Sequence, residues 1–202
     1  MSTSSKKRIL VVGTGGLARE FCAWFDDEIE VVGCSADQAD DRLAAQLPGR
    51  RYDNSVTPDQ AGTDQCVVAV GKPKDKRHLH AVLRQAGWQF PTFIHRSAIV
   101  APNVEMAEGV VISPGVVIGT NVTIAALAYL NFQVGVGHDA RIGRYVQVNP
   151  GAQLGGAVQI GDGALLGSNS ALLQGAVMGE NATLGLGAVC LTRVRAGETL
   201  VG

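Results

Sequence analysis

Aliphatic residues recur at every sixth position through the second half of the chain. Of the 18 positions spaced six apart from Ile94 to Ala196, 16 are Ile, Leu, Val or Met; Cys190 and Ala196 differ. A small or β-branched residue stands four places after most of these head positions, and glycine often follows them directly. This hexapeptide period is typical of a parallel β-helix, in which stacked coils together form the core. With three hexads to a coil, residues 18 apart are expected to stack.

The first ninety residues follow a different pattern. The apolar run Lys7–Val12 leads into the glycine-rich "GTGGLARE" and an amphipathic stretch to Asp26, which predicts a strand, a turn and a helix. The chain is thus expected to hold an α/β domain with a parallel sheet over residues 1–90 and a β-helix over residues 91–202. Further strands are predicted at 30–35 and 66–71, and a helix at 74–85 that ends before Gly87.

Composition and charge narrow the function classes. With 17 basic and 18 acidic residues the net charge is −1, which does not favour binding to nucleic acid or to an anionic membrane. The apolar run Ile9–Val12 is too short for a signal-peptide core or a membrane span. The four cysteines have irregular spacings that favour reduced thiols over disulfides or a zinc site. A cytoplasmic protein without a metal is therefore expected.

The glycine turn after the first strand matches a nucleotide-binding pattern. Gly13, Gly15 and Ala18 satisfy G-x-G-x-x-A, in which glycines let the backbone approach a phosphate at a helix N-terminus. Cys34 and Ser35 stand where an NAD site would have an acid at the end of the second strand. Three interpretations stay open: an NAD site, a site for another nucleotide, and a turn that serves packing alone.

Four motifs together resemble one family over residues 8–202. They are "VVGTGGLARE", "VVAVGKPKDKR", "FPTFIHRSAIVAPNV" and "VGHDARIG", and they are similar to those of the NeuD/PglD-like sugar O- and N-acetyltransferases. The resemblance implies a small Rossmann-like domain before a left-handed β-helix. It also implies a homotrimer with active sites between neighbouring β-helices, acetyl-CoA as donor, and a nucleotide-linked amino sugar as acceptor.

His138 and Asp139 lie in the last of these motifs. An amine or hydroxyl that attacks a thioester must lose a proton, and a histidine is suited to accept it near neutral pH. A nearby carboxylate can fix the tautomer of the imidazole and raise its basicity. We therefore predict that His138 is the general base and that Asp139 supports it.

The resemblance also assigns binding residues position by position. Family members often have a histidine at the position of Leu17 and an aspartate near Ser35, so these two depart from the pattern, and Asp37 is a candidate substitute for the missing acid. Gly156, 18 residues after His138, is in addition expected to stack beside it and to offer a donor to the oxyanion. The acetyl-CoA contacts fall on Asn131, Gln147, Gly156, Ser168 and Leu186, and the acceptor contacts on Gly15, Gly16, Leu17, Ser35, Asp37 and Gly71.

Other functions compete with this one. A sialic acid-type sugar O-acetyltransferase and a noncatalytic β-helix that binds a nucleotide remain as alternatives. A γ-type carbonic anhydrase needs three histidines around zinc, and only His95 and His138 fall in the repeats. No cysteine lies near the His138 motif, so we expect direct transfer without an acetyl-cysteine intermediate.

Overall fold

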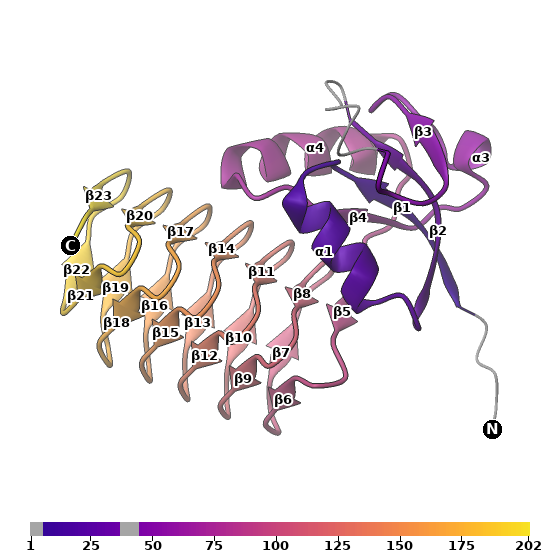
Figure 1. Cartoon of the computed structure of the whole chain (residues 1–202). Coiled ribbons are helices and arrows are strands. Elements are labelled where there is room, and N and C mark those ends of the chain that lie inside the picture. Colours follow the sequence, from indigo (N-terminus) through magenta and orange to yellow (C-terminus); the bar gives the residue numbers. More distant parts are fainter. Residues whose placement is uncertain (1–5, 37–44) are drawn as a thin grey trace. The chain divides into compact units, whose positions relative to one another are not determined.

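The computed structural model describes residues 6–36 and 45–202, which divide into two compact units. One unit holds the described residues up to Gly71 together with His78–Pro91, and the other holds Lys72–Arg77 together with Thr92–Gly202. The first is a parallel α/β unit, and the second consists of short parallel strands in three sheets (Figure 1). The expected fold class, an α/β domain followed by a β-helix, is confirmed.

The α/β unit is built on a four-stranded parallel sheet in the order β3-β2-β1-β4. Residues Ile9–Val12 of the central strand β1 are fully buried, which explains their unbroken apolar run. The chain leaves β1 on one side for β2 and later returns on the other side for β4, so the carboxyl end of β1 is a topological switch point. The elements are β1 (Lys7–Val12), α1 (Gly16–Trp24), β2 (Ile29–Ser35), β3 (Arg50–Tyr52), α3 (Pro58–Ala61), β4 (Cys66–Val68) and α4 (Pro73–Gln85).

The strand predicted at 66–71 is shorter than expected. It ends at Val68 because its ladder partner β1 ends at Val12, the residue paired with Val68. One last hydrogen bond, from Ala69 N–H to the Val12 carbonyl at 2.8 Å, closes the ladder. The apolar run continues past the strand because Ala69 stays buried beyond it.

The β-helix has three sheets that each take one dipeptide strand per coil, and partners on successive coils are 18 residues apart through most of its length. The first sheet contains β5 (Phe93–Ile94), β8 (Val111–Ile112), β11 (Tyr129–Leu130), β14 (Gln147–Val148), β17 (Leu165–Leu166), β20 (Thr183–Leu184) and β23 (Thr199–Leu200). The second contains β6 (Ile99–Val100), β9 (Val117–Ile118), β12 (Gly135–Val136), β15 (Gln153–Leu154), β18 (Ala171–Leu172) and β21 (Val189–Cys190). The third contains β7 (Glu105–Met106), β10 (Thr123–Ile124), β13 (Arg141–Ile142), β16 (Gln159–Ile160), β19 (Val177–Met178) and β22 (Arg193–Val194).

From β8 to β21, each strand places its second residue, the hexad head, inside the coil. Heads from Ile112 to Cys190 are buried and form one continuous core with the small residues four places later. The corners need a left-handed residue, and a positive φ recurs at every sixth residue from Asn103 to Gly187. Asn, Asp and Gly fill most of these positions because they adopt this conformation at low cost. We call the corners after the first and second sheets the first corner and the second corner.

The repeat slips by two residues in the last coil. The hexad phase predicts an inward head at Ala196, but Ala196 is exposed and Val194 is buried in its place. The next left-handed residue is accordingly Gly197, three places after Val194. The corner after Cys190 is two residues shorter than the others, so β22 pairs with β19 across 16 residues rather than 18.

The N-terminal part of α4 belongs to the same compact unit as the β-helix and brings a buried lysine to it. Lys76 is 1% exposed, and its Nζ donates a hydrogen bond to Gln147 Oε1 at 3.2 Å. The same Nζ lies 5.6 Å from the centre of the Tyr129 ring. Burial lowers the pKa of Lys76 from its usual 10.5 to about 7, because the charged form is poorly solvated there.

We expect this burial to give the stability of the protein a distinctive pH dependence. The folded protein releases the Lys76 proton near pH 7, whereas the unfolded chain keeps it to about pH 10.5. The cost of burying the ammonium is therefore complete below pH 7 and decreases as the pH rises. Relative to Lys76→Met, the wild type should gain up to ~1.4 kcal/mol of unfolding free energy per pH unit between pH 7 and 10.

Urea unfolding at fixed protein concentration measures this difference. Lys74→Met is the matched control, because Lys74 is exposed on the same helix. If the difference in unfolding free energy between wild type and Lys76→Met did not change with pH, the prediction would be contradicted.

Candidate active site

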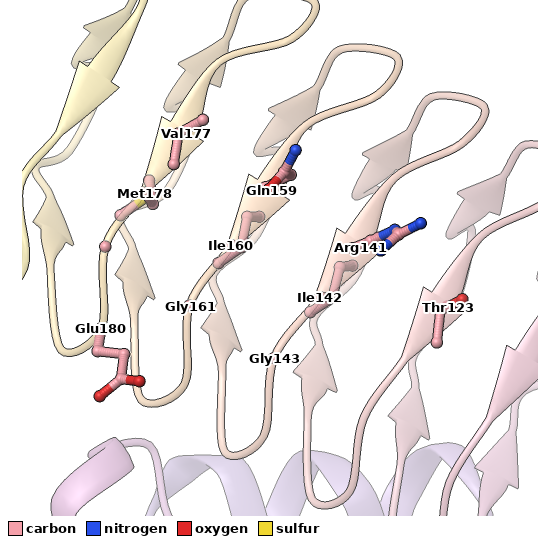
Figure 2. Close-up of a pocket in the computed structure, with 11 residues that line it drawn as sticks. Thr123, Arg141, Ile142, Gly143, Gln159, Ile160, Gly161, Val177, Met178 and Glu180 are labelled. Atoms are coloured by element: carbon pink, nitrogen blue, oxygen red, sulfur yellow. The ribbon is translucent and has the colours of Figure 1, made fainter.

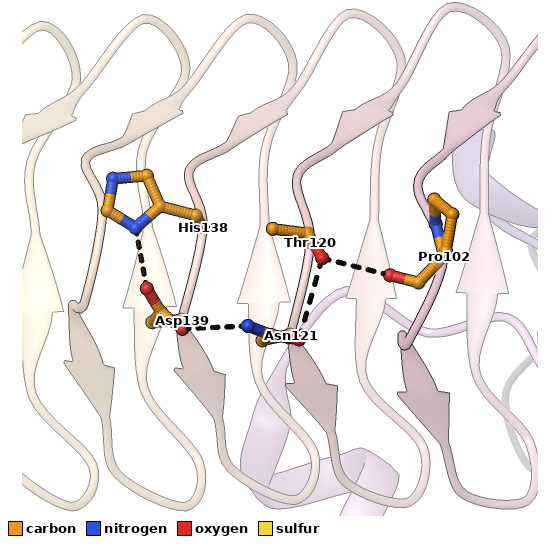
Figure 3. Close-up of polar contacts among 5 residues, drawn as sticks. All are labelled: Pro102, Thr120, Asn121, His138 and Asp139. Atoms are coloured by element: carbon orange, nitrogen blue, oxygen red, sulfur yellow. Dashed lines mark hydrogen bonds and ion pairs between the residues drawn. The ribbon is translucent and has the colours of Figure 1, made fainter.

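His138 and Asp139 form a hydrogen-bonded pair at the second corner, directly after β12. His138 Nδ1 lies 2.7 Å from Asp139 Oδ2, and both side chains are 54% exposed (Figure 3). Asp139 has φ 59°, the left-handed corner conformation, which turns its carboxylate back toward the preceding residue. With Nδ1–H donating to the carboxylate, the lone pair of Nε2 is left as the acceptor of the ring.

A second donor on the preceding coil holds the same carboxylate. Asn121, 18 residues before Asp139, donates from Nδ2 to Asp139 Oδ1 at 3.3 Å, while the Asp139 N–H donates to the Thr120 carbonyl at 3.0 Å. Thr120 Oγ1 in turn donates to the Pro102 carbonyl, so the polar contacts extend over three coils (Figure 3). The hydrogen bond from His138, followed by that from Asn121, lowers the pKa of Asp139 below its usual value. The sequence interpretation missed Asn121, although the 18-residue stacking pointed to it.

Gly156 lies directly against the imidazole. A Cβ built at this glycine would stand 2.7 Å from His138 Nε2 and 2.8 Å from Cε1, so any larger residue would displace the ring. The coils are joined here by a hydrogen bond from Ala157 N–H to the His138 carbonyl at 2.7 Å. Among the described residues the Gly156 N–H has no acceptor. The structure thus brings His138, Asp139 and Gly156 together at one corner.

The other residues assigned to the cofactor lie elsewhere in the chain. Asn131, Ser168 and Leu186 are at the first corner, and Leu186 is 78% exposed. Gln147 stands in β14 of the first sheet, where its side chain is buried under Lys76. Within one chain these residues and His138 belong to different edges of the β-helix.

Two shallow grooves cross the outer faces of the sheets. One, of about 370 Å³, runs over the second sheet from Gln133 at the first corner to Gly137, the neighbour of His138. The other, of about 460 Å³, crosses the third sheet and reaches Glu180; His138 is not among its lining residues (Figure 2). The groove on the second sheet therefore connects the two corners that carry the assigned residues. The groove on the third sheet is lined by side chains that include Thr123, Arg141, Gln159 and Val177.

The residues of the α/β unit that the sequence assigns to the acceptor lie at the carboxyl ends of its strands. Gly15 and Gly16 begin α1, whose first turn includes the half-buried Leu17, and Ser35 ends β2. Ser35 is fully buried, and its Oγ has no partner among the described residues. A Cβ at Gly13 would meet the Ala69 carbonyl oxygen at 2.7 Å, whereas one at Gly15 or Gly71 would meet nothing within 4 Å. Close packing therefore explains why position 13 is glycine, but it does not explain the glycines at positions 15 and 71. Asp37 lies outside the described residues.

Solved structures with the same architecture include acetyltransferases. The chain superposes with a TM-score of 0.87 on PerB from Caulobacter crescentus, solved with CoA and GDP-perosamine; identity is 26%, over 100% of this chain and 97% of the other. The acetyltransferase domain of PglB from Neisseria gonorrhoeae (23% identity, 98% and 97% coverage, TM-score 0.83) and WeeI from Acinetobacter baumannii (22%, 98% and 97%, 0.78) share the fold. No family model and no curated relative matches the chain.

The match to PerB spans both units and nearly the whole of each chain. The chain has the full-length architecture of the PglD/NeuD-like hexapeptide sugar acetyltransferases. The resemblance carried by the four sequence motifs is thereby confirmed. Within this architecture, the protein carries the His138–Asp139 pair on its β-helix and the glycine turn on its α/β unit.

Two further findings concern residues 6–36 and 45–202. No helix in these ranges is long and apolar enough to cross a membrane. The same ranges contain no cluster of three or more His, Cys, Asp or Glu side chains placed to hold a metal ion.

The two donors to Asp139 predict an order of effects on its pKa. Because the hydrogen bond from His138 contributes most, His138→Ala should raise the pKa of Asp139 toward its usual 3.8 by more than Asn121→Ala does. Carboxyl-carbon NMR titration measures both shifts. Asp53, whose pKa is lowered by Ser55, serves as an internal control that neither substitution should move. A larger shift in Asn121→Ala would contradict the geometry.

Proposed function

We propose that the protein transfers an acetyl group from acetyl-CoA to the amino group of a nucleotide-linked sugar, for surface glycan synthesis in the cytoplasm. The observation that carries the proposal is the His138 imidazole, oriented by Asp139 and packed on Gly156. PerB, which shares the whole fold, was solved with CoA and a nucleotide-linked amino sugar. Four free cysteines fit a cytoplasmic location.

His138 acts as the general base of a direct transfer. The neutral amine of the sugar attacks the thioester carbonyl carbon, and Nε2 accepts the proton that the amine loses. When the tetrahedral intermediate collapses, the C–S bond breaks and the thiolate of CoA takes that proton from the imidazolium. Asp139 stays ionised throughout, because its lowered pKa keeps it a carboxylate, and it stabilises the charged ring.

The Gly156 N–H supplies a donor for the oxyanion. It stands beside the imidazole, and no group of the described chain uses it. A backbone N–H in a rigid corner is preorganised, so it can stabilise the developing negative charge without rearrangement. The absence of a Cβ at Gly156 also leaves the space that the imidazole ring itself occupies.

The glycine turn of the α/β unit binds the nucleotide part of the acceptor. Gly15 and Gly71 have no packing reason to be glycine, and α1 begins at Gly16 with N–H groups suited to a phosphate. Leu17, Ser35 and Asp37 complete this site in our proposal. The buried, unpartnered Ser35 Oγ at the end of β2 offers a polar group where relatives have an acid.

A homotrimer joins the two corners into one site. The outward residues Ile99, Val117 and Val189 of the second sheet are 65%, 47% and 55% exposed, an apolar face that favours contact with another copy. We place this face at the subunit interface. His138 of one copy then meets Asn131, Ser168 and Leu186 of the next, which hold acetyl-CoA with Gln147. The third sheet, by contrast, presents outward polar residues at Glu105, Thr123, Arg141, Gln159 and Arg193.

The function is tested with a panel of nucleotide-linked 4-amino sugars and acetyl-CoA, with release of free thiol as the readout. We expect turnover of at least one member, and a loss of about 100-fold or more in His138→Ala because the base is gone. His78→Ala, on the exposed part of α4, is the control that should keep full activity. Turnover only with sialic acid would favour the O-acetyltransferase alternative. Absence of turnover with every acceptor would favour the noncatalytic scaffold.

The trimer is tested by introducing charged residues on the outward apolar face of the second sheet. Wild type should sediment at about three times the 21.0 kDa of one chain. Val117→Arg with Val189→Arg should dissociate it and abolish transfer, because burying unpaired guanidinium groups at an interface is costly. Val177→Arg makes the same change on the third sheet and should leave both properties intact. A monomeric wild type with full activity would contradict the shared site.

A further inference from the structure

The buried Lys76 fixes the orientation of the amide that it touches. Its Nζ donates to Gln147 Oε1 at 3.2 Å, and Gln147 itself is 1% exposed. An ammonium carries only donors, so Gln147 must turn its oxygen toward it and its Nε2 away. The neutral amine also donates, and the same orientation serves both forms.

The orientation of the Gln147 amide in turn fixes the orientation of the Asn149 amide. Gln147 Nε2 donates to Asn149 Oδ1 at 3.3 Å. The two residues are two apart along the strand, which places their side chains on the same outward face. Asn149 is half-buried at the first corner, and the contact occupies its oxygen. Its Nδ2 hydrogens are left over as donors at the corner where Asn131 also lies.

Asn131 has the same arrangement one coil earlier. Its Oδ1 accepts the N–H of Phe132 at 2.8 Å, which again leaves the amide nitrogen as the remaining polar group. Neither amide nitrogen donates to any group among the described residues. Two donor amides thus stand on neighbouring coils, which in a parallel sheet are about 4.8 Å apart.

We propose that Asn149 is a further acetyl-CoA-binding residue, whose side-chain N–H, oriented by Lys76 through Gln147, donates to a carbonyl oxygen of the pantetheine arm. The pantetheine arm carries two amide carbonyls along an extended chain, and both are acceptors that donors on successive coils can meet. Lys76 is then a positioning residue. This inference rests on the proposed function, because it assumes that the cofactor lies at the first corner.

Gln147→Glu tests the donor orientation. The carboxylate keeps a partner for Lys76 and adds an ion pair, so thermal stability should be unchanged or higher. It has no N–H, however, so Asn149 turns its amide nitrogen toward Glu and presents its oxygen to the ligand. We expect the affinity for CoA, measured by calorimetry on the intact protein, to fall about 5- to 30-fold. A merely structural role for this pair predicts no loss of affinity, and a direct contact of Gln147 with the ligand predicts a loss in Gln147→Glu but none in Asn149→Asp, which would also contradict the inference.

Two more variants complete the test. Asn149→Asp removes the donor directly and should weaken CoA binding to the same extent, while Gln159→Glu makes the same chemical change on the third sheet and should leave it unchanged. Wild-type affinity in both Gln147→Glu and Asn149→Asp would overturn the inference and leave the proposed function standing. Failure of the wild type itself to bind CoA would overturn both.

Discussion

The site depends on the stacking of coils 18 residues apart. Each coil has an aliphatic head on each of three sheets and cannot bury these heads alone, so the coil above must repeat the pattern in register. The same register fixes the corners, because a left-handed residue must recur after every strand. A side chain at a corner therefore meets the residues 18 places before and after it, and this is how Asn121 reaches Asp139 and how His138 covers Gly156.

This rigid register suits acid–base chemistry. A histidine works as a base when one ring nitrogen is held and the other is free, and Asp139 holds Nδ1 of His138. The carboxylate is in turn held by Asn121, so the ring orientation is set by two coils rather than by one flexible side chain. The missing Cβ at Gly156 then leaves room for the imidazole ring in this position. Each of these features follows from backbone positions that the core fixes.

Much of the fold could be predicted from the chain alone, because the signals are local. Lys7–Val12 became β1 as expected, and the heads from Ile112 to Leu184 are buried as the period requires. The prediction of a head at Ala196 was wrong, because one corner is two residues shorter than the others. This shortening shifts the phase of every later residue but leaves the amino-acid composition of the repeat almost unchanged. The strand predicted at 66–71 was too long, because the length of β4 depends on where its partner β1 ends.

The sequence by itself determined the two-part architecture and the neighbourhood of His138 and Asp139, since periodicity and adjacent residues are properties of the chain. The tertiary structure decided which distant groups meet. Lys76 and Gln147 are 71 residues apart, and no spacing rule connects a helix residue to a strand of the β-helix. Their hydrogen bond forms only when the first turns of α4 pack on the coils, because no local pattern of the sequence encodes a contact between such distant residues.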